Sequence, residues 1–96
     1  MDDIKQMWQE FEELRFPRGC GGREVDGVCL ALTDTMAVGC IDTFIIQHGR
    51  LDAERINDLQ GRVANLERIV PLLNDEARVY FELLLKVSRK VLQSVT

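Results

Sequence analysis

An apolar stretch near the middle of the chain, GVCLALTDTMAVGCIDTFIIQHG at residues 27–49, is long enough to cross a lipid bilayer but contains Asp34 and Asp42. On an insertion scale each Leu, Ile, Phe or Val contributes about −0.3 to −0.6 kcal/mol, whereas an aspartate near the bilayer centre costs about +2.5 to +3.5 kcal/mol. The eight residues of those four types in the stretch do not offset two aspartates. The stretch therefore predicts a helix of a water-soluble protein, and we expect no membrane partner.

The charge balance and the cysteines narrow the class of protein further. The 96 residues suit one domain, and the net charge of −4 argues against binding to nucleic acid, which requires a basic surface stripe. The first residues, MDDIKQMWQEFEEL, are acidic and lack the cationic start of a secretory signal. Three cysteines are an odd number for a disulfide framework. We therefore expect a cytoplasmic protein that binds neither nucleic acid nor a cofactor.

Helical periodicity covers almost the whole chain, because apolar residues recur at intervals of three and four and only two prolines occur. Residues 1–96 are therefore expected to form one all-α domain, a small four-helix antiparallel bundle with a short N-terminal helix and three longer helices. The expected helices cover about residues 3–15, 27–48, 53–70 and 75–94, and a flexible glycine-rich loop covers residues 17–26. Asp26 is expected to cap the second helix, and Gly49 is expected to end it.

The second helix has two apolar faces when its residues are placed about 100° apart on a helical wheel. One face carries Val25, Val28, Cys29, Leu32, Met36, Gly39, Thr43 and Ile46, and the opposite face carries Leu30, Val38, Ile41 and Ile45. A helix with two apolar faces needs two partners. We expect the later helices to cover one face, and the first helix or a second copy of the chain to cover the other. The expected homodimer interface, which completes the bundle, is Leu30, Asp34, Val38, Ile41 and Ile45.

The two aspartates of the second helix lead to different expectations. Asp42 lies on an edge between the two faces, where we expect it to meet solvent. Asp34 lies within the second apolar face, where a buried carboxylate needs a partner such as an arginine, a threonine hydroxyl or a backbone donor. At an interface, a paired Asp34 would set the register of the two chains.

Two glutamates of the first helix provide the only pattern that points to a metal site. Glu10 and Glu13 stand three residues apart, a spacing that also occurs in helical carboxylate metal sites. Together with Asp34 they define one alternative function, a metal-dependent hydrolase of the all-α carboxylate type. Such a site needs a second acidic pair on a facing helix, and the second helix offers only isolated aspartates.

The glycine-rich loop contains a candidate ligand or redox site at Arg18, Cys20 and Arg23, because two arginines suit an anion and favour the thiolate of an accessible cysteine. No residue is assigned a catalytic role. The pattern as a whole favours a non-enzymatic helical interaction or adaptor protein that pairs with itself or binds another protein. A further alternative is a small acidic inhibitor, of the immunity or antitoxin type, that covers a basic site on its target.

Overall fold

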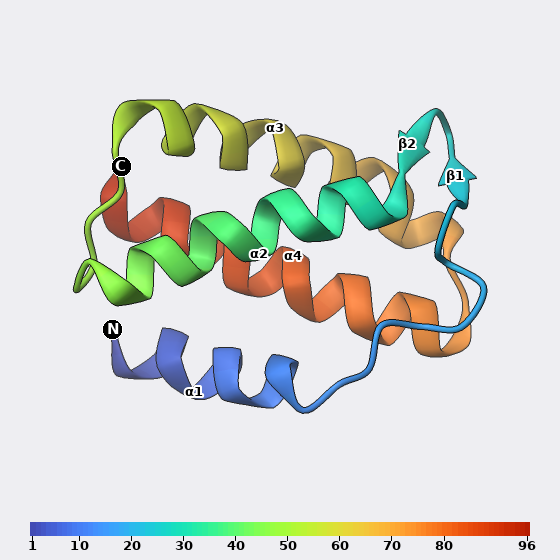
Figure 1. Ribbon diagram of the computed structural model, residues 1–96, viewed down its shortest axis with the longest axis horizontal. Helices are drawn as coiled ribbons and strands as arrows, with labels where there is room; N and C mark the ends of the chain where they lie inside the picture. The colour runs from blue at the N-terminus through green and yellow to red at the C-terminus, as the bar shows by residue number, and fades with distance from the viewer.

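Four α-helices make up most of the chain in the computed structural model, which describes residues 1–96 (Figure 1). The helices are α1 (Asp2–Glu12), α2 (Leu30–Ile46), α3 (Ala53–Ile69) and α4 (Asp75–Val95). A short 3-10 helix, η1 (Val70–Leu72), follows α3. Val70 keeps the α conformation, with φ −54° and ψ −44°, and α3 ends there because Pro71 has no N–H to donate to a carbonyl of the preceding turn. The mostly helical fold with four helices that the periodicity predicts is therefore confirmed.

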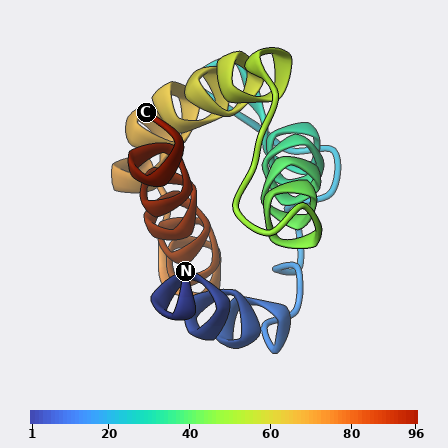
Figure 2. The same ribbon diagram turned by 90° about the vertical axis from the view of Figure 1, so that its left-hand side faces the viewer.

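The helices lie side by side and alternate in direction. α3 runs opposite to both α2 and α4, and α1 runs opposite to α4 (Figure 1). In the view along the helices, their order around the molecule is α1, α4, α3 and α2 (Figure 2). α4 packs against each of the other three helices, whereas α2 packs on α3 and α4. This arrangement gives α4 three neighbours and leaves one side of α2 facing away from the other helices.

A two-stranded hairpin stands where we expected the first turn of the second helix. β1 (Glu24–Val25) pairs antiparallel with β2 (Val28–Cys29). Between the strands, Asp26 and Gly27 have φ angles of 50° and 78°, the pair of positive values that a two-residue type I′ turn requires. Asp26 is therefore a turn residue and does not cap α2, which begins at Leu30.

The segment that we expected to be a flexible loop is held against the rest of the protein. Arg68 of α3 donates from Nη2 to the backbone oxygen of Asp26 at 2.7 Å, and from Nε to the carboxylate of Asp26 at 3.2 Å. Cys20 and Val28 are buried, with 1% and 6% of their surface exposed. The segment is therefore a packed element of the fold as well as a connection.

The C-terminal ends of α1 and α2 lie a few residues before the positions that we expected from the sequence. α1 stops at Glu12 rather than near Arg15, and α2 stops at Ile46. Beyond α2, the N–H of Gly49 donates to the carbonyl of Phe44 at 2.8 Å, and Gly49 has a φ of 91°. The first residue with a positive φ after α2 is His48, at 55°, and its N–H donates to the carbonyl of Ile45 at 3.1 Å. These two bonds form a Schellman motif in which His48, rather than the expected Gly49, holds the left-handed position that ends α2.

The core of the single chain uses the face of α2 that we expected at a dimer interface. Leu30 and Ile41 are fully buried, and Val38 and Ile45 pack against the core from its edge. The other helices supply further fully buried side chains, among them Leu59, Leu66, Ile69, Phe81, Leu84, Val87 and Val91. Leu30 and Ile41 are thus not accessible to a second chain, and it is the opposite apolar face of α2 that points outward.

Candidate functional site

The two aspartates of α2 each accept a hydrogen bond from an aromatic side chain of another helix. The Tyr80 hydroxyl of α4 donates to Oδ1 of Asp34 at 2.6 Å. The indole Nε1 of Trp8 in α1 donates to Oδ1 of Asp42 at 3.1 Å. The expected need of Asp34 for a partner is therefore met inside the chain, by a tyrosine hydroxyl rather than by an arginine, a threonine or the backbone. Asp42 lies at the surface, but it also joins α2 to α1.

Burial sets the protonation behaviour of the Asp34–Tyr80 pair. Desolvation raises the pKa of Asp34 above its ordinary value of 3.8, and the hydrogen bond from Tyr80 offsets part of this rise. Desolvation, followed by the bond to Asp34 and the charge of that carboxylate, raises the pKa of Tyr80. The tyrosine therefore keeps its proton and remains the donor. The two groups with raised pKa values are hydrogen-bonded to each other, so the buried carboxylate of Asp34 has a structural role.

An aromatic cluster between α1 and α4 positions both donors. Trp8 and Phe11 stack with ring centroids 4.9 Å apart, and Phe11 lies 4.7 Å from Tyr80. Phe16, which follows α1, makes an edge-on contact with Tyr80 at 5.6 Å. Such contacts contribute beyond the area they bury, and the polar tips of Trp and Tyr usually find a partner when the rings are buried. From the sequence we did not predict that Trp8 and Tyr80 donate to the two aspartates, although they are the only tryptophan and the only tyrosine and lie on apolar stripes.

The outward face of α2 carries Ile46, which has the highest exposed fraction of the large apolar side chains, 69%. Leu32 is 54% exposed, and Gly39 lies midway between Leu32 and Ile46, seven residues from each. Because seven residues are close to two helical turns, these three residues form a single line along α2. With Met36 and Thr43, which are partly exposed, they form what we call the outward stripe.

At the centre of the outward stripe lies Gly39, which is exposed and has no side chain. A Cβ atom added at Gly39 would meet no atom within 4 Å, and the same is true of Gly61 in α3. A glycine inside a helix costs about 0.5–1 kcal/mol relative to alanine, so packing within the single chain gives no reason for Gly39. The Thr43 hydroxyl donates to the carbonyl of Gly39 at 2.9 Å. Because that hydroxyl is already bonded, covering Thr43 would leave no polar atom of its side chain unpaired.

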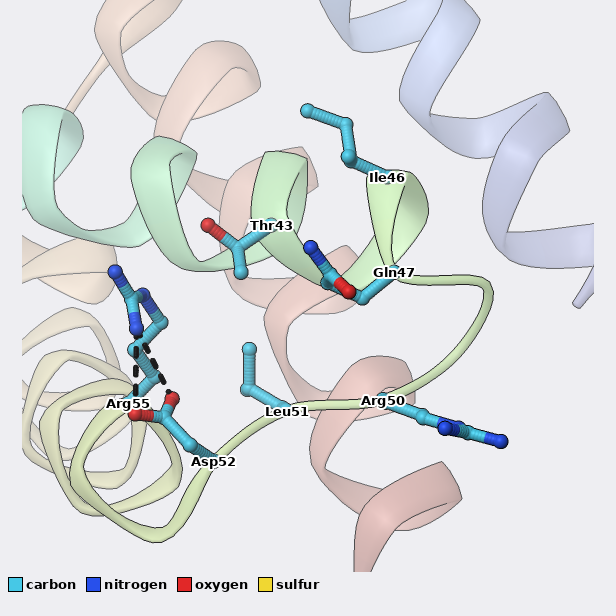
Figure 3. Close-up of a pocket in the computed structure, with 7 residues that line it drawn as sticks. All are labelled: Thr43, Ile46, Gln47, Arg50, Leu51, Asp52 and Arg55. Atoms are coloured by element: carbon cyan, nitrogen blue, oxygen red, sulfur yellow. Dashed lines mark hydrogen bonds and ion pairs between the residues drawn. The ribbon is translucent and has the colours of Figure 1, made fainter.

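A hollow of about 630 Å³ adjoins the end of the outward stripe (Figure 3). Its lining residues are Thr43, Ile46, Gln47, Arg50, Leu51, Asp52 and Arg55. Nη1 of Arg55 lies 3.2 Å from Oδ2 of Asp52, and Figure 3 shows that the Arg50 side chain points away from this pair. The two arginines therefore do not converge on one anion. Thr43 and Ile46 of α2 and Leu51 of the segment that follows α2 form part of the wall of the hollow.

The structure contains neither a cluster of metal ligands nor a helix that could cross a membrane. No three His, Cys, Asp or Glu side chains lie close enough together to hold a metal ion, so the single chain does not assemble Glu10, Glu13 and Asp34 into a metal site. None of the four helices combines the length and the apolar character that crossing a membrane demands.

The candidate ligand or redox loop has a different geometry from the one we expected. Cys20 is buried, with 1% of its surface exposed, so the expectation of an accessible thiol there is wrong. Arg18 and Arg23 line a hollow of about 370 Å³ at the start of α4, together with Asp75 and Glu76. These two acidic residues offset the charge of the arginines. The loop therefore offers neither a reactive cysteine nor a clear excess of positive charge.

Comparisons of the chain with protein-family models, with curated proteins and with solved structures found no match. We therefore infer function from the geometry of the chain alone.

Proposed function

We propose that this protein is a non-enzymatic interaction module of the cytoplasm, and that it forms a homodimer through the outward stripe of α2. The observation that carries the proposal is the exposure of Leu32 and Ile46 in one line with Gly39, on a helix whose other apolar face is already buried. Monomeric proteins expose single apolar residues freely, but an aligned set marks a contact surface. α2 contains no basic residue and only two acidic ones, so its outward stripe suits another apolar helix.

The energy available from the outward stripe indicates a weak dimer. Fully burying a leucine or isoleucine contributes about 1.5–3 kcal/mol, and roughly half of each side chain is still exposed in Leu32 and Ile46. Four such side chains in a symmetric pair supply about 3–6 kcal/mol, against an association cost of at least about 4 kcal/mol. The contact between the helix backbones at Gly39 adds to this sum. We therefore expect a reversible dimer whose population depends on protein concentration.

The pairing of Asp34 with Tyr80 favours an interaction protein over an enzyme. Titratable groups with shifted pKa values are the usual candidates for catalysis. Here the two groups concerned bond to each other at 2.6 Å and join α2 to α4, which accounts for them without a substrate.

The test is the solution mass of the protein over a range of concentrations, measured by light scattering. We expect the wild type to approach twice the 11.0 kDa of the chain and Ile46→Asp to remain near 11.0 kDa while keeping its helical circular dichroism. The matched control is Val79→Asp, because Val79 is 60% exposed but lies on α4, outside the outward stripe. A wild type that is monomeric at every concentration, or two variants with equal masses, would contradict the proposal.

A further inference from the structure

We infer that two copies of the chain pair antiparallel through α2, with Gly39 on the two-fold axis and Leu32 of each copy filling the hollow beside Ile46 of the other. The inference rests on the homodimer proposed above and adds the direction of the helices and the occupant of the hollow.

The spacing of the outward stripe is symmetric about Gly39. Leu32 precedes Gly39 by seven residues and Ile46 follows it by seven, which places each about 10.5 Å from Gly39 along the helix axis. In a two-fold symmetric interface, a contact from residue i to residue j is repeated from j to i. If two α2 helices cross antiparallel at Gly39, Leu32 of each copy therefore arrives at the level of Ile46 of the other.

Gly39 suits the crossing point because nothing covers it. The absence of any atom within 4 Å of an added Cβ means that a second helix backbone has room to approach there. Small residues at a helix crossing let the two backbones come close, which brings the flanking side chains into contact. Thr43, one turn further along, already donates its hydroxyl to the carbonyl of Gly39. The centre of the interface therefore requires no new hydrogen bond.

The hollow at the end of α2 lies where the leucine of a second copy would arrive. Thr43 and Ile46 of α2 line the hollow together with Leu51, and Figure 3 shows that the Ile46 side chain extends away from Leu51. A volume of about 630 Å³ admits a leucine side chain. Leu32 is 54% exposed in the single chain, so it has apolar surface to bury there. The symmetry of the pair supplies two leucines and two hollows.

Charge distinguishes the antiparallel pair from a parallel one. A parallel pair in register would bring the two Asp42 carboxylates to the same level, and both hollows, with Arg50 and Arg55 of each copy, to the same end. An antiparallel pair that crosses at Gly39 separates the two Asp42 residues by about 9 Å along the helix axis. It also places the hollows at opposite ends. Like charges therefore oppose the parallel arrangement and not the antiparallel one.

Engineered disulfides test which positions of the two copies lie close together, because a disulfide requires Cα atoms about 4.4–6.8 Å apart. The variants are Leu32→Cys, Ile46→Cys and the double variant Leu32→Cys/Ile46→Cys, all with Cys29→Ser, since Cys29 is partly exposed. Positions 32 and 46 lie about 21 Å apart along one helix, so they do not bridge within a chain. After mild oxidation, dimers are measured on a non-reducing gel, with Cys29→Ser alone as the background.

The antiparallel pair predicts dimers for the double variant, at least ten times above background, and none for Leu32→Cys or Ile46→Cys alone. Efficient cross-linking of Leu32→Cys alone would show a parallel pair, which overturns this inference and leaves the proposed homodimer intact. No cross-linking in a protein that light scattering shows to be dimeric would mean that α2 is not the interface. No cross-linking in a monomeric protein would overturn both the inference and the proposed function.

Discussion

Replacing Tyr80 with phenylalanine tests the bond that holds the most buried aspartate of α2. The substitution removes one oxygen, the only protein donor to Asp34, and leaves the ring in place beside Phe11 and Phe16. Tyr80 is only 6% exposed, so the ring keeps its packing. The change therefore isolates the hydrogen bond from the aromatic contacts.

The expected loss follows from the charge of the acceptor. A hydrogen bond to a charged group contributes about 1.5–3 kcal/mol, and a bond between neutral groups contributes about 0.5–1.5 kcal/mol. Because Asp34 is partly exposed, we expect the lower part of the first range, a loss of about 2 kcal/mol in the free energy of unfolding at neutral pH. In a chain of this size 1 kcal/mol corresponds to about 4–8 °C, so the melting temperature should fall by about 8–16 °C.

The loss should depend on pH in a direction that the pKa of Asp34 determines. Burial holds this pKa above 3.8 in the folded protein, although the bond from Tyr80 lowers it, so Tyr80→Phe should raise it further. A carboxyl group with a raised folded pKa contributes its full stability below the unfolded value and loses it as the pH rises through the folded value. Tyr80→Phe should therefore cost more at pH 7 than near pH 3, which lies below the ordinary pKa of Asp34, because a protonated Asp34 loses only a bond between neutral groups.

The assay is urea unfolding followed by circular dichroism at both pH values, at a protein concentration low enough for the monomer. The comparison includes wild type, Tyr80→Phe, Asp34→Asn and the double variant, which together form a cycle for the pair. In the Asp34→Asn background an acceptor remains but the charge is gone, so Tyr80→Phe should cost about 1 kcal/mol at either pH. Equal losses at pH 7 and pH 3 with Asp34 present would refute the reasoning.

Two further predictions concern glycines and thiols. Gly39→Ala and Gly61→Ala should each raise the free energy of unfolding of the monomer by about 0.5–1 kcal/mol, because an added Cβ meets nothing, but only Gly39→Ala should reduce the dimer seen by light scattering. Equal dimer loss in both variants would exclude a crossing at Gly39. In a thiol titration without denaturant, Cys29 should react first, whereas Cys20 and Cys40, which are 1% and 4% exposed, should react only on unfolding. Fast reaction of all three thiols in the folded protein would contradict this burial.

Local signals were sufficient to predict where α3 and α4 begin. Asp52 and Asn74 stand at their N-cap positions, whereas α2 ends before the expected residue, with His48 and Gly49 both at positive φ after it. Each of these positions depends on chemistry within a few residues, which a sequence displays. The asparagine and aspartate make no side-chain capping bond, so position rather than capping contact is what the sequence predicted.

The hairpin before α2 shows where local signals conflict. Asp26 suits a helix N-cap, but Asp26 followed by Gly27 between two valines is also a strong signal for a two-residue hairpin turn. The structure adopts the hairpin, in which both residues have positive φ and Arg68 binds the backbone and the side chain of Asp26. The arginine lies 42 residues away in the chain, so a local pattern does not reveal its contribution.

The choice between the two apolar faces of α2 depends on the same kind of distant contact. Because both faces are apolar, hydrophobic burial alone gives little preference for which one turns inward. Asp34 and Asp42 are eight residues apart, which places them about 80° apart and so on the same side of the helix. Tyr80 from α4 and Trp8 from α1 donate to that side and set the rotation of α2 about its axis.

A rotation of α2 that buried Leu32 and Ile46 instead would break both of these hydrogen bonds. It would also expose Leu30 and Ile41, which are fully buried in the structure. The polar bonds and the apolar packing thus favour the same orientation, and local and distant interactions agree on a single fold. The aspartates that make this stretch unsuitable for a membrane therefore also determine which apolar face of α2 remains on the surface, where we propose that a second chain binds.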